Sequence, residues 1–168
     1  MGISRMADAL SSTASAFSRD NDPEFVRLAA PSTLKMVEML LDRQPSHPGL
    51  LMTACSGFTQ YAYAFLQVDL EMSDAPASAS ALELKSRGRA MYARARAYCG
   101  RALEVRHPGA RQALAGQPGT LLASAVRADV PALYWTAAAW GGELALADNQ
   151  LVRLGEIASV RALLTRAQ

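Results

Sequence analysis

Apolar residues recur at helical spacing along most of this chain, and breaks rich in Pro and Gly separate the segments that carry the pattern. No run alternates apolar and polar residues in the manner of a strand. The pattern therefore predicts an all-α fold. We expect a short helix or frayed arm over 4–19, followed by helices over about 23–43, 48–68, 81–106, 110–115, 120–127, 129–147 and 149–166.

The first long helix has a strong start signal. Asp22 is suited to accept hydrogen bonds from the free backbone N–H groups, Pro23 fits the first helical position, and Glu24 favours the positive helix end. Pro31 lies inside the same segment. Because proline lacks a backbone N–H, we expect it to kink this helix or to divide it in two.

Two of the predicted helices are nearly free of charge. The segment 48–68 has no ionic side chain, and Glu143 is the only one inside the segment that begins at Asp129. The first is long enough to suggest a membrane span, but too polar for one. Its polar residues are Thr53, Ser56, Thr59, Gln60, Tyr61, Tyr63 and Gln67. A helix without a charged face is usually buried by its neighbours, so we expect both segments at the centre of a water-soluble body.

Small residues within these two helices indicate close contacts. Gly57 lies in the first and Gly141–Gly142 in the second, where glycine lowers helix propensity. Close approach of another helix is the physical reason that we expect for them. Cys55 and Cys99 fall on separate helices, and buried free thiols are the favoured interpretation, with a disulfide as the alternative in an oxidising compartment.

Composition restricts the class of function. The net charge of +2 is too small to favour nucleic acid as a partner. The two histidines, His47 and His107, belong to no metal-spaced set, and no phosphate-binding loop or nucleophile elbow is present in the sequence. We therefore predict a protein that is not an enzyme and needs no cofactor or metal. The first residues show no apolar signal segment, which indicates either a cytoplasmic protein or a mature chain whose targeting segment has been removed.

The segment 81–106 carries the most informative pattern. One face holds Met91, Tyr92, Ala95, Tyr98, Cys99, Ala102 and Leu103. Arginines border this face, with Arg87, Arg94 and Arg101 along one edge and Arg89 and Arg96 along the other. They indicate either a guanidinium rim that meets an anionic ligand or an acidic partner, or ordinary side chains whose stems cover the core, and we favour the second.

Aromatic residues gather on the uncharged helices. One group is Phe58, Tyr61, Tyr63 and Phe65 with Gln60, and the other is Tyr134, Trp135 and Trp140. Such residues line an internal cavity in some proteins and simply fill the core in more of them. Loose repeats are also visible: Ala95, Cys99 and Ala102 followed by Pro108 approximate the second helix of a tetratricopeptide repeat, and Pro45 punctuates an earlier hairpin.

Four stretches together resemble a known family. They are Asp22-Pro23-Glu24 with Ala29-Ala30-Pro31 and Leu34, the run 57–65 (GFTQYAYAF), the pattern Arg89-Ala90-x-Tyr92-x-Arg94-Ala95, and the run 130–141 (VPALYWTAAAWG). These are similar to the T-component family of TRAP transporters, and the resemblance extends from about Asp22 to Arg166.

The resemblance implies a helical protein with cryptic tetratricopeptide-like repeats, carried outside the cytoplasmic membrane, often as a lipoprotein. It also implies association with the substrate-binding (P) subunit of a TRAP transporter, assembly as a trimer, and an apolar channel for a small organic ligand. The expected organisation is an arm or short helix over 1–21 and a single domain over 22–168, with hairpins stacked as a right-handed solenoid or bundle. The alternative function is a cytoplasmic helical-repeat scaffold that binds a peptide.

Ten residues are the candidates for lining a ligand site or channel. They are Phe58, Gln60, Tyr61, Arg89, Tyr92, Arg94, Tyr98, Tyr134, Trp135 and Trp140.

Overall fold

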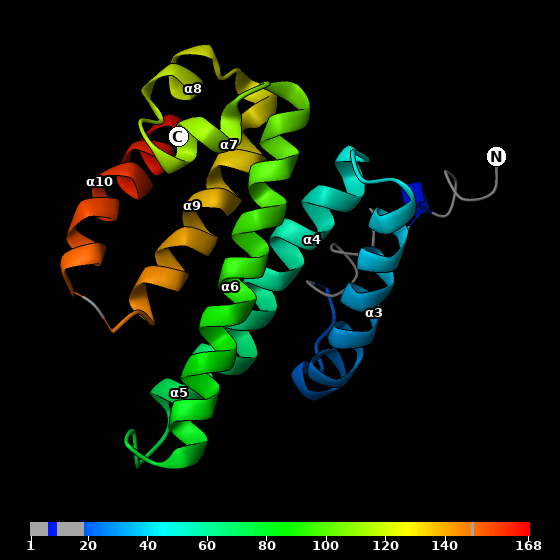
Figure 1. The fold of residues 1–168 in the computed structure, drawn as a ribbon. Coiled ribbons are helices and arrows are strands. Elements are labelled where there is room, and N and C mark those ends of the chain that lie inside the picture. Colours follow the sequence, from blue (N-terminus) through cyan, green and yellow to red (C-terminus); the bar gives the residue numbers. More distant parts are fainter. Residues whose placement is uncertain (1–6, 10–18, 149) are drawn as a thin grey trace.

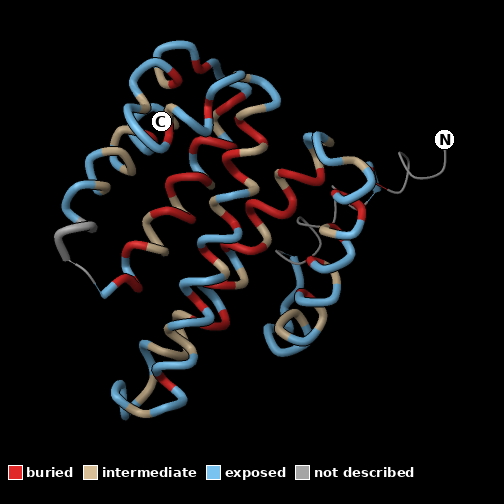
Figure 2. The backbone as a smooth tube through the Cα atoms, in the orientation of Figure 1, coloured by how far each residue is buried: buried red, intermediate tan, exposed pale blue. Residues whose placement is uncertain are grey.

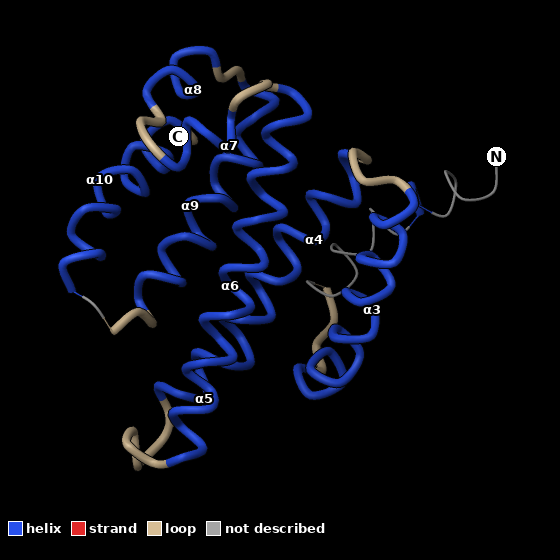
Figure 3. Tube along the Cα trace, viewed as in Figure 1, coloured by secondary structure: helices blue, strands red, loops and turns tan. Residues whose placement is uncertain are grey.

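A computed structural model describes residues 7–9, 19–148 and 150–168 of the chain. Within these residues the structure is helical and contains no strand (Figure 3). The longer helices are α3 (Pro23–Arg43), α4 (Pro48–Tyr61), α6 (Ala79–Arg106), α9 (Val130–Ala145) and α10 (Gln150–Arg166). The shorter ones are the π-helix η1 (Ala62–Gln67), α5 (Val68–Glu71), α7 (Ala110–Ala115), α8 (Gly119–Ser124) and the 3₁₀-helix η2 (Arg127–Asp129).

The long helices pack in the order in which they follow one another along the chain. α3 lies against α4, α4 against α6, α6 against α9, and α9 against α10, and neighbours run in opposite directions (Figure 1). The predicted all-α class is confirmed, whereas the right-handed tetratricopeptide-like stacking stays a prediction. Most of the predicted arm lies outside the described residues, but residues 7–9 are helical and Ala7 is fully buried.

Local signals at the start of α3 act as expected. The Oδ1 atom of Asp22 accepts from the backbone N–H of Glu24 at 3.1 Å and of Phe25 at 3.0 Å. Of the two outcomes expected at Pro31, division of the helix is wrong, because α3 continues through it to Arg43, and the kink stays a prediction. Five buried residues of α3 contribute to its packing, and tertiary burial of this kind outweighs the roughly 3 kcal/mol that an internal proline costs.

The helix predicted over 48–68 is longer and less regular than expected. It begins at Pro48, after the capping residue His47, whose Nδ1 accepts from the backbone N–H of Leu50. It then changes to a π-helix in η1 and ends with α5 at Glu71. The guanidinium of Arg27 stabilises this region, since it donates to the Phe65 carbonyl at 3.2 Å and to both carboxylate oxygens of Asp69 at 2.6 and 3.0 Å. These hydrogen bonds lower the pKa of Asp69.

The core runs through three helices. The buried faces of α4, α6 and α9 meet along the middle of the molecule (Figure 2), which confirms that both uncharged segments are largely interior. The helix between them is α6, which packs against both. No helix of the described residues is long and apolar enough to cross a bilayer.

Two smaller elements depart from the predicted bounds. α8 begins at Gly119 and ends at Ser124, so it is shorter than the segment expected over 120–127. Arg127 instead begins the 3₁₀ turn η2, which leads directly into α9. A run of six residues is too short for periodicity to locate its ends.

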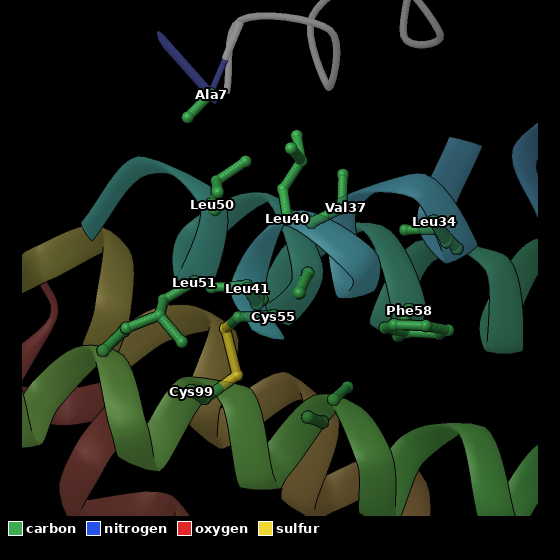
Figure 4. Packing of buried hydrophobic residues seen from close by; sticks show 14 residues of the cluster. Ala7, Leu34, Val37, Leu40, Leu41, Leu50, Leu51, Cys55, Phe58 and Cys99 are labelled. Carbon is green, nitrogen blue, oxygen red and sulfur yellow. A yellow bond between two sulfur atoms is a disulfide. The ribbon is translucent and has the colours of Figure 1, made fainter. Parts of the chain in front are cut away.

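The expectation of free thiols is wrong. Cys55 of α4 and Cys99 of α6 form a disulfide, and both are fully buried (Figure 4). Leu41 and Leu51 belong to the same hydrophobic cluster. The two cysteines lie 44 residues apart in sequence, and they meet only because α4 and α6 pack face to face.

We predict that replacing both cysteines by alanine lowers the free energy of unfolding by up to about 4 kcal/mol, the chain-entropy value for a loop of 44 residues. Denaturant titrations followed by circular dichroism measure the change. A reductant should destabilise the wild type in the same direction and leave the Cys55→Ala/Cys99→Ala variant unaffected. Equal midpoints for the oxidised wild type and this variant would contradict the prediction.

Close approach at glycine, which we expected in both uncharged helices, is confirmed. A Cβ at Gly57 would lie 2.6 Å from the Leu34 side chain of α3, and a Cβ at Gly142 would lie 2.3 Å from the Tyr92 ring of α6. The Tyr92 ring therefore rests directly on the α9 backbone. Because aromatic ring atoms backed by packed helices have little room to move, this contact constrains the separation of α6 and α9.

Gly142→Ala should therefore destabilise the protein by about 1–3 kcal/mol through overpacking, despite the better helix propensity of alanine. The matched control is Gly155→Ala in α10, where nothing lies within 4 Å of the added methyl group. The control should be neutral or stabilise by up to about 1 kcal/mol. Thermal unfolding of the two variants separates these effects, and equal stabilisation by both would be the contrary result.

Candidate functional site

The ten candidate residues fall on three helices and do not form one continuous cluster. Phe58, Gln60 and Tyr61 belong to α4, Arg89, Tyr92, Arg94 and Tyr98 to α6, and Tyr134, Trp135 and Trp140 to α9. The structure places them in separate contacts on the two sides of α6.

The first contact joins α3, α4 and α6. The rings of Phe58 and Tyr98 are stacked with centroids 5.9 Å apart, and the Arg94 guanidinium lies 5.3 Å from the Phe58 ring centroid. Glu38 of α3 completes the cluster, because its Oε1 accepts from the Tyr98 hydroxyl at 2.8 Å and lies 3.6 Å from Nε of Arg94. We call these four residues the Glu38 cluster.

Glu38 itself is shielded from water, whereas its partner Arg94 is exposed. Only 12% of the Glu38 side chain is exposed. Burial and the neighbouring carboxylate raise the pKa of Tyr98 to about 12, so its hydroxyl stays protonated and donates to Glu38. Arg101 covers the other side with its guanidinium 5.2 Å from the Tyr98 ring centroid, and it donates to the Pro45 carbonyl at 2.7 Å.

The second contact lies on the opposite side of α6. The Arg96 guanidinium is 4.2 Å from the Trp140 ring centroid and donates to Glu143 at 3.0 Å. The indole N–H of Trp140 donates to Glu156 of α10, which also lies 3.7 Å from Arg96. A cation–π contact and two carboxylates thus hold α6, α9 and α10 together.

Three other candidates have different surroundings. The Tyr92 hydroxyl donates to Gln67 Oε1 at 2.7 Å, and burial is the main cause that raises its pKa to about 12. Tyr61 is half-buried against Phe65, with ring centroids 5.5 Å apart. Gln60 is exposed and donates to the Ser56 carbonyl at 3.2 Å within its own helix.

The aromatic pair on α9 has one member in the core, because Trp135 packs against the same hydrophobic cluster as Tyr98, the cluster that contains Phe58. Tyr134 is exposed and meets Trp135 edge-on, with centroids 5.1 Å apart. Arg89 is exposed and lines an open groove beside α6. Of the five arginines, Arg94, Arg96 and Arg101 place their guanidinium groups over aromatic rings.

Sequence reasoning missed a buried carboxylate at the start of α9. Asp129 is fully buried, and its Oδ2 contacts His107 Nε2 at 2.8 Å and accepts from the Val126 backbone N–H at 2.8 Å. Nε of Arg106 forms an ion pair with Oδ1 at 2.7 Å but not an aligned hydrogen bond. Burial raises the pKa of Asp129, but these hydrogen bonds and cations outweigh it, so the pKa lies below its usual range. His107 and Asp129 both flank predicted helix ends, which was the only available signal.

Most polar clusters of the described residues therefore connect one helix to another. No group of three or more His, Cys, Asp or Glu side chains that could hold a metal occurs in this part of the chain. These features define an all-helical protein, within the described residues, whose polar clusters hold its helices together. A model of the TRAP transporter T-component family matches residues 19–168, and the chain belongs to this family.

A relative from Treponema pallidum (strain Nichols) is similar to this chain. The two are 30% identical over 134 residues, which cover 77% of this chain and 42% of the relative. The chain therefore spans about two fifths of the length of that protein, which is described as uncharacterized.

Glu38 offers a test of the first contact. Glu38→Ala removes the acceptor of the Tyr98 hydroxyl and the carboxylate beside Arg94, so it should lower the free energy of unfolding by about 1.5–3 kcal/mol. Lys35→Ala removes only the exposed partner of Glu38, and should cost about 0.5 kcal/mol or less. Urea titrations of both variants provide the comparison. Equal effects would mean that the Tyr98 hydroxyl and the Arg94 guanidinium do not depend on Glu38.

Proposed function

We propose that this protein is a non-enzymatic accessory component of a TRAP-type solute transporter, held in the periplasm, where it docks on the substrate-binding subunit. Membership of the T-component family over residues 19–168 is the observation that carries this proposal. The family places the chain among the components of a TRAP transporter, and the features below support the location and the partner.

The disulfide between α4 and α6 supports a location outside the cytoplasm. Disulfides persist in oxidising compartments such as the periplasm and are rare in the cytosol, where thiols are kept reduced. Cys55 and Cys99 are both fully buried and paired with each other. This pairing favours the periplasmic accessory protein over the alternative of a cytoplasmic scaffold.

Exposed apolar side chains on α3 support docking of a protein partner. Phe25, Leu28, Met36 and Met39 recur at helical spacing and are 49–70% exposed. They lie on the side of α3 opposite its buried stripe. Large exposed apolar surfaces of this kind are typical of protein-binding sites, and methionine adapts well to a partner surface.

Three further parts of the proposal rest on the resemblance to the family. They are the trimer, the lipid anchor, and a channel that takes a small, partly apolar ligand. The ten candidate residues remain our proposal for side chains that meet such a ligand. Arg89 is the candidate that lines an open groove and makes no ion pair within the described residues.

The docking proposal is tested with the substrate-binding subunit of a TRAP transporter from the same organism. Biolayer interferometry with the full chain should show saturable binding at micromolar concentration. Leu28→Ser/Met39→Ser should weaken it at least about tenfold, since it removes two exposed apolar anchors.

Leu154→Ser is the matched control, because Leu154 on α10 is as exposed as Leu28, at 70%. This variant should bind like the wild type. If the subunit fails to bind at micromolar concentration, the proposed partner is wrong. If both variants weaken binding equally, α3 is not the docking surface.

A further inference from the structure

An open groove of about 460 Å³ lies between α6 and the segment that follows α9. Its volume is in the range of small-molecule sites, about 300–1,000 Å³. The apolar side chains that line it are those of Leu82, Ala90, Ala93 and Leu146. The polar groups are Lys85, Ser86, Arg89, Glu143 and Asp148.

Gly88 builds one wall of this groove. A Cβ at this position would lie 2.9 Å from Cδ1 of Leu146, so glycine is what lets Leu146 rest on the α6 backbone. Leu146 is thereby held against α6 at Gly88, and Arg89 is the next residue of that helix. An apolar wall and a guanidinium therefore lie next to each other along the groove.

The charges of the groove leave one cation without a counter-ion. Lys85 pairs with Asp148, and Glu143 pairs with Arg96 at 3.0 Å. Both carboxylates of the groove are thus engaged by other cations. Arg89 forms no ion pair or hydrogen bond with the described residues, although it lines the same groove.

We propose that this groove binds a small organic carboxylate with a short apolar body. The Arg89 guanidinium would bind the carboxylate by donating two parallel N–H···O hydrogen bonds, a geometry for which arginine is suited and lysine is not. The apolar body would lie along Ala90, Ala93 and Leu146. The inference rests on the ligand-binding part of the proposed function and is separate from docking of the subunit.

Hexanoate is the probe, titrated into the full chain labelled with ¹⁵N and followed by NMR. Saturable shifts should appear at α6 and at the end of α9, with tighter binding than for acetate, which lacks the body, or hexan-1-ol, which lacks the charge. Inorganic phosphate distinguishes this site from a general anion site. Binding of phosphate as tight as that of hexanoate would overturn the proposal.

Arg89→Gln should weaken hexanoate binding at least about tenfold. Arg87→Gln is the matched control, since Arg87 is also exposed on α6 but does not line the groove. Both positions are exposed on a helix, so both variants are expected to fold. Wild-type affinity in Arg89→Gln, or an equal loss in Arg87→Gln, would overturn the proposal.

A second pair of variants tests the charge without removing Arg89. Ala93 is exposed one turn after Arg89, so Ala93→Glu places a carboxylate within reach of the guanidinium. Ala93→Gln has the same size and no charge. Hexanoate should bind at least about tenfold more weakly to the Glu variant than to the Gln variant, and equal affinities would contradict the proposal. Loss of this site with intact binding of the transporter subunit would leave the docking role standing.

Discussion

The structure depends on how tightly α6 is held between α4 and α9. On one side a disulfide joins Cys55 to Cys99, and on the other Gly142 lets the Tyr92 ring rest on the α9 backbone. Because α6 is held from both sides, its two edges face different neighbours. Arg94 therefore contacts Glu38 of α3, whereas Arg96 contacts the carboxylates of Glu143 in α9 and Glu156 in α10. The distribution of charge over the molecule follows from this central packing.

Helix positions could be predicted where the signal is local. Asp22 and Pro23 mark the start of α3, and Pro–Gly breaks mark the ends of α3 and α6, because capping and helix termination act within a few residues. Features that depend on distant packing could not be predicted. Sequence left two alternatives open for Cys55 and Cys99 and two for Pro31, and tertiary contacts decide for the disulfide and against a divided α3. The helix propensity of a segment carries no information about contacts between residues that are distant in sequence.

The candidate site shows the same division. Helical periodicity correctly separated the arginines of α6 into two edges, since that depends only on the helix repeat. It did not predict that Glu38, Glu143 and Glu156 would engage Arg94 and Arg96, because each of these carboxylates comes from another helix. Once those partners are assigned, Arg89 differs from the arginines around it. Arg89 has no ion-pair partner among the described residues. This difference, rather than the arginine pattern, makes its groove the candidate ligand site.

The π-helix η1 has a consequence for comparing this chain with its relatives. A π turn closes between residues five apart, so it holds one more residue than the α turn that it replaces. Residues 62–67 are thus where a single-residue insertion is absorbed without moving the rest of the helix. In relatives whose helix is regular throughout, an alignment should open a one-residue gap here. Residues on either side of that gap would then stay in phase with the core.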